Sequence, residues 1–192
     1  MISPELRERR QRAAALLPDR KLDALVVFSP ANIRYLTGFT GSKGLLLLLP
    51  DRAALFTDPR YGLQAREQTD CPVHVARGSL LVALARRART RRVCRLGVEQ
   101  AYLSYDEYLA LDESLPAAVT MAPVAGMIES LRMIKSPAEI QAIRRSVETA
   151  SEAFRQVLPL IRPGVSELDL AAEVEYRMRQ LGAEKPAFET IV

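Results

Sequence analysis

His74 is the only histidine in the 192 residues, and it limits the chemistry that this sequence can perform. With one histidine, no His-based zinc site is possible, and a Ser-His-Asp triad would have to use His74. No G-x-S-x-G segment supplies the nucleophile of such a triad. In "PVHVA" the alternation predicts a strand with Val73 and Val75 on one side and His74 on the other. We therefore interpret His74 as a surface or packed residue.

The segment "GFTGSKG" is the one glycine-rich candidate for binding a phosphate group. Gly38, Gly41 and Gly44 fall three residues apart, with Lys43 beside them. A phosphate loop follows a strand and opens a helix, so that backbone N–H groups and the helix dipole face the anion. This segment instead follows a short helical pattern and leads into the apolar run "LLLLL". We therefore expect a turn rather than a nucleotide site.

The carboxylates are scattered, and no set of them has the spacing of a metal cage or of an acid–base pair. The candidates considered are Asp51, Asp58, Asp70, Glu99, Asp106, Glu107, Asp112 and Glu113. Asp106 and Glu107 stand at a helix start, where capping and the helix dipole explain them. From its residues alone, the chain is predicted to carry no catalytic residue and no metal ligand.

Charge and composition favour a cytoplasmic protein without a nucleic-acid or membrane partner. The formal net charge is +4, but we interpret the one dense basic run, residues 85–95, as a solvated helix end. This run has no interleaved aromatic residues of the kind that stack on nucleic-acid bases. No run approaches the roughly 18 apolar residues of a membrane helix. The N-terminus lacks an apolar secretory core, and Cys71 and Cys94 lie far apart, which fits a reducing compartment.

Strand and helix patterns alternate through residues 1–125 and predict an α/β domain. Two of the expected strands, "KGLLLLLP" and "RAALFTD", are joined at Pro50-Asp51 as a hairpin, so the sheet is predicted to be mixed. It should have five or six strands, flanked by helices; the other expected strands are 23–28, 71–76, 94–99 and 118–123. The expected helices include 31–36, 60–68, 79–90 and 104–115.

The pattern changes after residue 125. We expect a connector at 126–135 and then two amphipathic helices, 137–160 and 166–181, each opened by a capping box. The final "AFETIV" resembles the first strand of a second domain, 136–192, whose remainder is missing. Because nothing in the sequence covers the apolar faces of these helices, we expect self-association into a dimer or larger species, or disorder after about residue 135.

Five segments in order and in register resemble the Xaa-Pro aminopeptidase, prolidase and creatinase family of pita-bread enzymes. They are "NIRYLTGF" (32–39), "TDPRY" (57–61), "LRMIKSPAEI" (131–140), "IRPGVSELDLA" (161–171) and "GAEKPAFETIV" (182–192). The first two resemble the N-terminal domain of that family. The third resembles its interdomain junction, and the last two resemble the first helices and first strand of the pita-bread catalytic domain.

The resemblance implies a proline-specific metallopeptidase that acts on proline-containing peptides. Complete members hold two divalent metal ions, manganese, cobalt or zinc, on two Asp, two Glu and a His. Those ligands fall downstream of the segment that "AFETIV" resembles. No residue here matches them, so the 192 residues alone are predicted to be inactive.

The resemblance also implies a role for the N-terminal domain in forming a homodimer and walling the substrate cleft. The candidate wall residues are Asn32, Tyr35, Asp58, Arg60 and Tyr61. Each also has a purely structural interpretation. Asp58 can cap the helix starting at Pro59, and Arg60 can pair with Asp58 or with another surface carboxylate. The two tyrosines can pack over the sheet with their hydroxyls in water.

Two other functions stay open at this point. Some relatives keep this architecture without the metal site and bind proteins such as histones, which a basic surface would suit. Others, like creatinase, hydrolyse a C–N bond of a small molecule. The metal-ligand segments encoded downstream would separate a peptidase from a binding module, whereas this end of the sequence does not separate peptidase from creatinase action.

Overall fold

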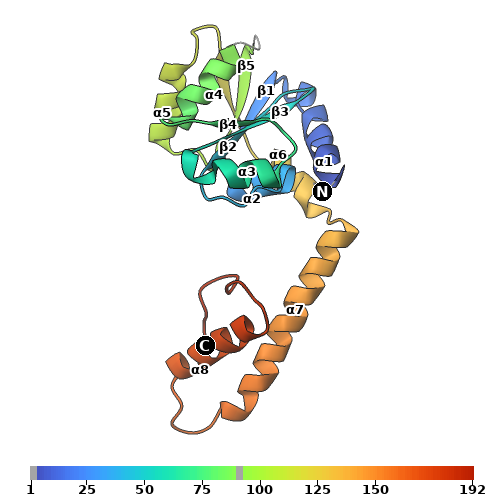
Figure 1. Ribbon diagram of the computed structural model, residues 1–192, viewed down its shortest axis with the longest axis vertical. Coiled ribbons are helices and arrows are strands. Elements are labelled where there is room, and N and C mark those ends of the chain that lie inside the picture. Colours follow the sequence, from blue (N-terminus) through green and yellow to red (C-terminus); the bar gives the residue numbers. More distant parts are fainter. Residues whose placement is uncertain (1–3, 90–92) are drawn as a thin grey trace. The chain divides into compact units, whose positions relative to one another are not determined.

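The computed structural model describes residues 4–89 and 93–192, and the chain divides into two compact units, 1–133 and 134–192 (Figure 1). The predicted boundaries at 125 and 136 lie on either side of this division.

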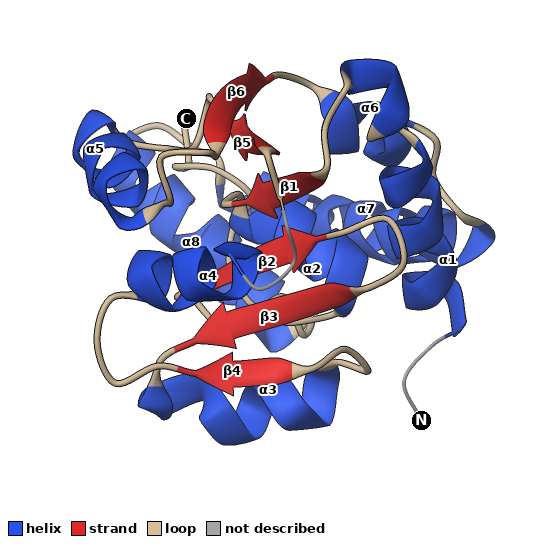
Figure 2. Cartoon of the chain, turned by 90° about the horizontal axis from the view of Figure 1, so that it is seen from above, coloured by secondary structure: helices blue, strands red, loops and turns tan. Residues whose placement is uncertain are grey.

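The first unit is built on a mixed six-stranded sheet, as predicted, with strand order β4-β3-β2-β1-β5-β6 (Figure 2). Only β2 runs against its neighbours; the other described strands all point the same way. The strands are β1 (Ala24–Val27), β2 (Gly44–Leu48), β3 (Ala53–Thr57), β4 (Val73–Val75), β5 (Arg95–Glu99) and β6 (Thr120–Val124).

The reversed strand comes from the predicted hairpin. β2 and β3 pair in antiparallel register, with Leu46 opposite Leu55, and the Leu49 N–H donates to the Arg52 carbonyl at 2.8 Å across the turn. Because β2 is buried on both faces, its five-residue run GLLLL is nearly all leucine.

Helices cover both faces of the sheet and bury two apolar clusters (Figure 2). One face packs under α1 (Pro4–Ala15), α2 (Pro30–Thr37), α3 (Gly62–Gln68) and α6 (Met127–Met133). The other packs under α4 (Leu80–Arg89) and α5 (Tyr105–Ser114). The basic run of residues 85–95 enters α4, while its residues 90–92 lie outside the described part of the chain.

The predicted connector at 126–135 differs from the structure, which folds most of it into α6. Met127 and Ile128 are 3% and 1% exposed and join the same core cluster as α1 and α2. Their apolar side chains give a short helix a buried face, which a solvated connector would not have.

Two glycines show why β1, β5 and α2 fit together. Gly38 ends α2 at φ +78°, a conformation that residues with a side chain rarely adopt. In β5, a Cβ at Gly97 would lie 2.8 Å from Leu22 Cδ1 and 3.1 Å from Leu25 Cδ1, so any other residue would require these leucine side chains to shift.

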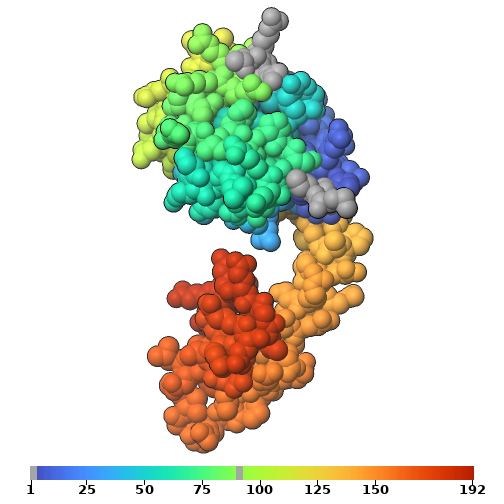
Figure 3. Space-filling view, in the orientation of Figure 1, coloured from blue at the N-terminus to red at the C-terminus, as the bar shows by residue number. Residues whose placement is uncertain are grey.

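The second unit consists of α7 (Pro137–Val157) and α8 (Glu167–Gln180), which pack against each other. Both helices begin with the predicted capping boxes, Ser136 with Glu139 and Ser166 with Asp169. The atoms of this unit, orange to red, form a continuous surface of their own (Figure 3).

Most of the apolar face of this unit stays in solvent. Ala153 and Val157 are buried, but Ile140, Ile143, Val147 and Phe154 are about half exposed or more. The predicted strand "AFETIV" is absent, because residues 183–192 form no strand in the structure. A strand needs a neighbour to hydrogen-bond, and no described segment pairs with this one.

None of the helices in residues 4–89 and 93–192 combines the length and apolar character needed to span a bilayer.

Candidate functional site

The carboxyl ends of β1, β3, β4, β5 and β6 meet at one edge of the sheet, because these strands run parallel. Ligands of open α/β sheets bind outside this edge. Ser29 and α2 follow β1, Asp58 follows β3, and Glu99 ends β5. All five predicted cleft-wall residues lie in the segments that follow β1 and β3 at this carboxyl edge: Asn32 and Tyr35 on α2, and Asp58, Arg60 and Tyr61 after β3.

Asp58 and Arg60 form a surface pair that also starts a helix. The Asp58 carboxylate accepts the Arg60 N–H at 2.9 Å, and Arg60 Nη2 lies 2.7 Å from Asp58 Oδ2. The Arg60 side chain is 72% exposed and that of Asp58 is 20% exposed. The hydrogen bond from Arg60 is the main cause that lowers the Asp58 pKa, with Lys43 adding to it, so Asp58 is ionised at neutral pH. Both the predicted cap and the predicted pair are confirmed.

Tyr61 lies beside this pair at the surface. Its ring stands edge-on to Phe39 at 6.0 Å between centroids, and its hydroxyl is 2.7 Å from the Ser42 hydroxyl. The Arg60 guanidinium lies 5.4 Å from the centre of the Tyr61 ring. Arg60 and Tyr61 thus present a cation and a phenol side by side.

A hollow of about 420 Å³ adjoins Asp58 at the same edge. Its polar lining includes Lys43, Asp58, Tyr102 and Glu107. Lys43 comes from the glycine-rich segment, which forms the predicted turn into β2 and opens no helix. Polar groups of both signs surround this hollow, as at a surface that recognises a polar ligand.

Asn32 lies beneath the edge and is completely buried. Its Nδ2 donates to Glu99 Oε1 and to Glu129 Oε1, each at 2.6 Å, and its Oδ1 accepts from Arg132 Nη1 at 2.8 Å. The side chain therefore joins α2, β5 and α6, and it reaches no solvent from which a ligand could approach.

Glu99 is the functional-site residue that sequence analysis passed over as one of the scattered carboxylates. It is 5% exposed, and its Oε2 accepts the N–H groups of Phe28 and Ser29 at 2.7 and 2.8 Å. Burial is the main cause that raises the Glu99 pKa; these donors and Asn32 oppose it, and nearby Glu129 adds to it. The one signal in the sequence was a glutamate that ends an otherwise apolar strand.

Tyr35 is also interior, 6% exposed, on α2. The Arg9 guanidinium lies 4.3 Å from the centre of its ring, and its hydroxyl lies 3.5 Å from the Leu131 carbonyl. The prediction that this hydroxyl is in water is wrong, because α6 covers it. Asn32 and Tyr35 are buried beneath the carboxyl edge, whereas Asp58, Arg60 and Tyr61 lie at its surface.

His74 is a packed strand residue, one of the two interpretations offered for it. Its ring stacks on Phe56 at 4.9 Å, and burial, with Arg87 nearby, lowers its pKa. Its Nε2 has no hydrogen-bond partner in the part of the chain that the structure describes. A neutral imidazole stacked on a phenyl ring explains this residue without a catalytic role.

The carboxylates at this edge do not fit a metal ion. Within residues 4–89 and 93–192, no group of three or more His, Cys, Asp or Glu side chains is placed to bind one. Both Glu99 oxygens and Oε1 of the neighbouring Glu129 already accept N–H groups of the protein.

Comparison with known proteins decides the family. Residues 9–134 match the Creatinase/Prolidase N-terminal domain, and residues 141–192 match Metallopeptidase family M24. The chain belongs to the creatinase/prolidase family. The family resemblance noted from the five segments is thereby confirmed.

Several relatives match over nearly the whole chain. An uncharacterized peptidase of Bacillus subtilis, YqhT, is 38% identical over 172 residues, which are 89% of this chain and 48% of that protein. The Xaa-Pro dipeptidase of Pyrococcus furiosus is 28% identical over 97% of this chain and 52% of its own length. This member of the creatinase/prolidase family thus spans about half the length of the curated relatives that it matches.

Solved structures of Xaa-Pro peptidases have the same fold as this chain. The Xaa-Pro dipeptidase from Bacillus anthracis superposes with a TM-score of 0.91 at 31% identity, over 95% of this chain and 51% of that one. The N-terminal domain of the cytoplasmic peptidase PepQ from Mycobacterium tuberculosis, 36% identical, matches 65% of this chain and 98% of its own, with a TM-score of 0.61.

Proposed function

We propose that this chain forms the N-terminal portion of a proline-specific metallopeptidase, an Xaa-Pro aminopeptidase or dipeptidase. The observation that carries the proposal is the succession of two matches, a creatinase/prolidase N-terminal domain and then part of an M24 metallopeptidase domain, along one chain. Relatives named Xaa-Pro dipeptidase cover this chain almost completely with half of their own length.

In this proposal, the chemistry belongs to residues outside the segment. In a complete member, two divalent metal ions would supply an activated water for hydrolysis of the amide before proline. No described cluster here can hold them, as the occupied oxygens of Glu99 and Glu129 illustrate. The 192 residues alone are therefore proposed to be catalytically incompetent.

The carboxyl edge supplies a wall of the substrate cleft. Asp58 fixes Arg60 through backbone and side-chain hydrogen bonds, and Arg60 lies beside Tyr61, so a cation and a hydroxyl are held ready at the surface. Asn32 and Tyr35 serve this wall indirectly by tying α2 to α6. We further propose that the protein is a cytoplasmic homodimer, with the exposed apolar face of α7 contributing to assembly.

Arg60 provides the test of the wall. In the protein encoded by the complete reading frame, Arg60→Ala should raise KM for an Xaa-Pro peptide about tenfold with little change in kcat, because a contact made equally in ground and transition states is lost. The matched control is Arg66→Ala, which removes an exposed arginine on α3 away from the hollow. Equal KM values for the Arg60→Ala and Arg66→Ala variants would show that Arg60 does not contact the substrate.

The codons after residue 192 distinguish peptidase from binding module. A continuing frame that encodes two Asp, two Glu and a His as metal ligands supports the peptidase. The same fold without those ligands would overturn the proposal in favour of a protein-binding module.

A further inference from the structure

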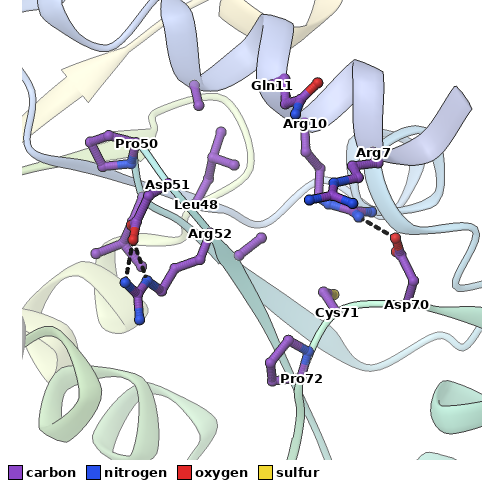
Figure 4. Close-up of a pocket in the computed structure, with 13 residues that line it drawn as sticks. Arg7, Arg10, Gln11, Leu48, Pro50, Asp51, Arg52, Asp70, Cys71 and Pro72 are labelled. Atoms are coloured by element: carbon purple, nitrogen blue, oxygen red, sulfur yellow. Dashed lines mark hydrogen bonds and ion pairs between the residues drawn. The ribbon is translucent and has the colours of Figure 1, made fainter. Parts of the chain in front are cut away.

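A second hollow lies at the opposite edge of the sheet, away from the proposed cleft wall (Figure 4). It has a volume of about 370 Å³. Three segments distant in sequence enclose it: α1, the turn between β2 and β3, and residues 70–72 before β4. We call it the arginine hollow, after Arg7, Arg10 and Arg52 in its lining.

Arg10 is the fixed cation of the arginine hollow. It is 9% exposed; Nη2 lies 2.7 Å from Asp70 Oδ2, and Nη1 donates to the Leu36 carbonyl at 2.8 Å. A buried guanidinium carries five N–H donors, and these two bonds leave others for a ligand. Asp70 and Leu36 therefore position the Arg10 side chain without exhausting it.

Arg7 adds a second cation one helical turn earlier. It is exposed and has no hydrogen-bond or ion-pair partner among residues 4–89 and 93–192. On the far side of the opening, Arg52 already binds Asp51 (Figure 4). Three arginines and two aspartates line the hollow, so one positive charge is uncompensated, and both aspartates are engaged.

Apart from Gln11, the rest of the lining is apolar. Leu48, Ala53 and Pro72 contribute to it, together with Cys71. Burial raises the pKa of the Cys71 thiol, which therefore stays protonated and adds no negative charge. An apolar surface beside spare guanidinium donors in an open hollow suits a ligand with an anionic head and a hydrocarbon body.

We propose that the arginine hollow binds a small organic anion, its carboxylate or phosphate head held by Arg7 and Arg10 and its apolar body lying over Leu48 and Pro72. This site is separate from the proposed cleft wall and does not depend on the peptidase assignment.

The test is a titration of the ¹⁵N-labelled 192-residue chain, followed by the amide signals of Leu48, Ala53 and Cys71. The probes are N-acetylleucine, its uncharged amide and inorganic phosphate. N-acetylleucine should shift these signals, and the amide should bind at least tenfold more weakly. Inorganic phosphate shows whether an anion without an apolar body also binds.

Arg7→Gln should weaken binding of the preferred anion about tenfold, the value of one charge-assisted hydrogen bond. Arg12→Gln, an exposed arginine on the same helix that does not line the hollow, is the matched control with the same change of charge. The proposal is overturned if neither anion shifts these amide signals, or if N-acetylleucine and its amide bind equally well. It is also overturned if Arg7→Gln and Arg12→Gln weaken binding to the same extent.

Discussion

Glu99 keeps a carboxylate in the protein interior by means of N–H donors. Its oxygens accept from the Phe28 and Ser29 backbone and from Asn32, and Arg132 donates to the Asn32 amide oxygen. Hydrogen bonds to a charged acceptor offset part of the desolvation cost. The group thus joins β5 to the start of α2.

Removing this acceptor should destabilise the folded protein. We expect Glu99→Ala to lower the free energy of unfolding by about 2–4 kcal/mol, because the Phe28 and Ser29 N–H groups and Asn32 lose a buried partner. Urea denaturation measures the change. Glu67→Ala, at an exposed position on α3, is the control and should stay within about 0.5 kcal/mol of the wild type. Equal values would show that the Glu99 contacts contribute nothing.

The raised pKa of Glu99 also gives stability a pH dependence. Because the folded-state pKa lies above the unfolded value of 4.5, the favourable contribution is complete below pH 4.5. It is lost as the pH rises through the folded-state pKa. Relative to Glu99→Gln, the wild type should therefore lose stability across that interval in urea titrations. If the unfolding free energies of the wild type and Glu99→Gln change in parallel with pH, burial does not raise the pKa of Glu99.

Residue-scale prediction succeeded where the partner is close in sequence. The Asp58 cap and the Asp58–Arg60 pair span two residues, and local capping rules suffice for them. The Asn32–Glu99 bond joins residues 67 apart, so it exists only once β1 and β5 are adjacent. The buried positions of Asn32 and Tyr35 were unpredictable for the same reason.

At the scale of elements, α7 exposes a stripe that a globular protein would normally cover. Ile143 and Val147, one turn apart, are 50% and 58% exposed. Adjacent exposed apolar side chains favour association. This finding supports the expected self-association.

We expect the double variant Ile143→Glu/Val147→Glu to shift sedimentation of the chain from dimers or larger species toward the monomer. Burying two carboxylates in an apolar contact costs several kcal/mol. The control is Gln141→Glu/Ser146→Glu, which makes the same charge change at exposed polar positions of α7. A wild-type chain that sediments as a monomer at all concentrations would contradict the prediction.

Elements with strong local signals were predictable, and those defined by packing were not. Apolar runs bounded by turn residues located the six strands, and capping boxes located the starts of α5, α7 and α8. The helix α6 was missed because its seven residues show too little periodicity. The predicted strand at "AFETIV" fails for want of a pairing partner in the structure.

At the scale of the whole molecule, two units match two successive family models. The α/β class and the family followed from the sequence, since five segments lie in family order. The cleft wall did not follow from these residues themselves, because a cleft is formed only where further parts of the protein fold around it. In our proposal, the surface group of Asp58, Arg60 and Tyr61 is what this first unit contributes to such a cleft.

The central claim is that these 192 residues support the peptidase without containing its reactive centre. The most direct measurement adds manganese to the purified chain and follows cleavage of an Xaa-Pro dipeptide, with an active Xaa-Pro dipeptidase as positive control. We predict a rate equal to that of the protein-free solution. Metal-dependent turnover above that rate would contradict the account.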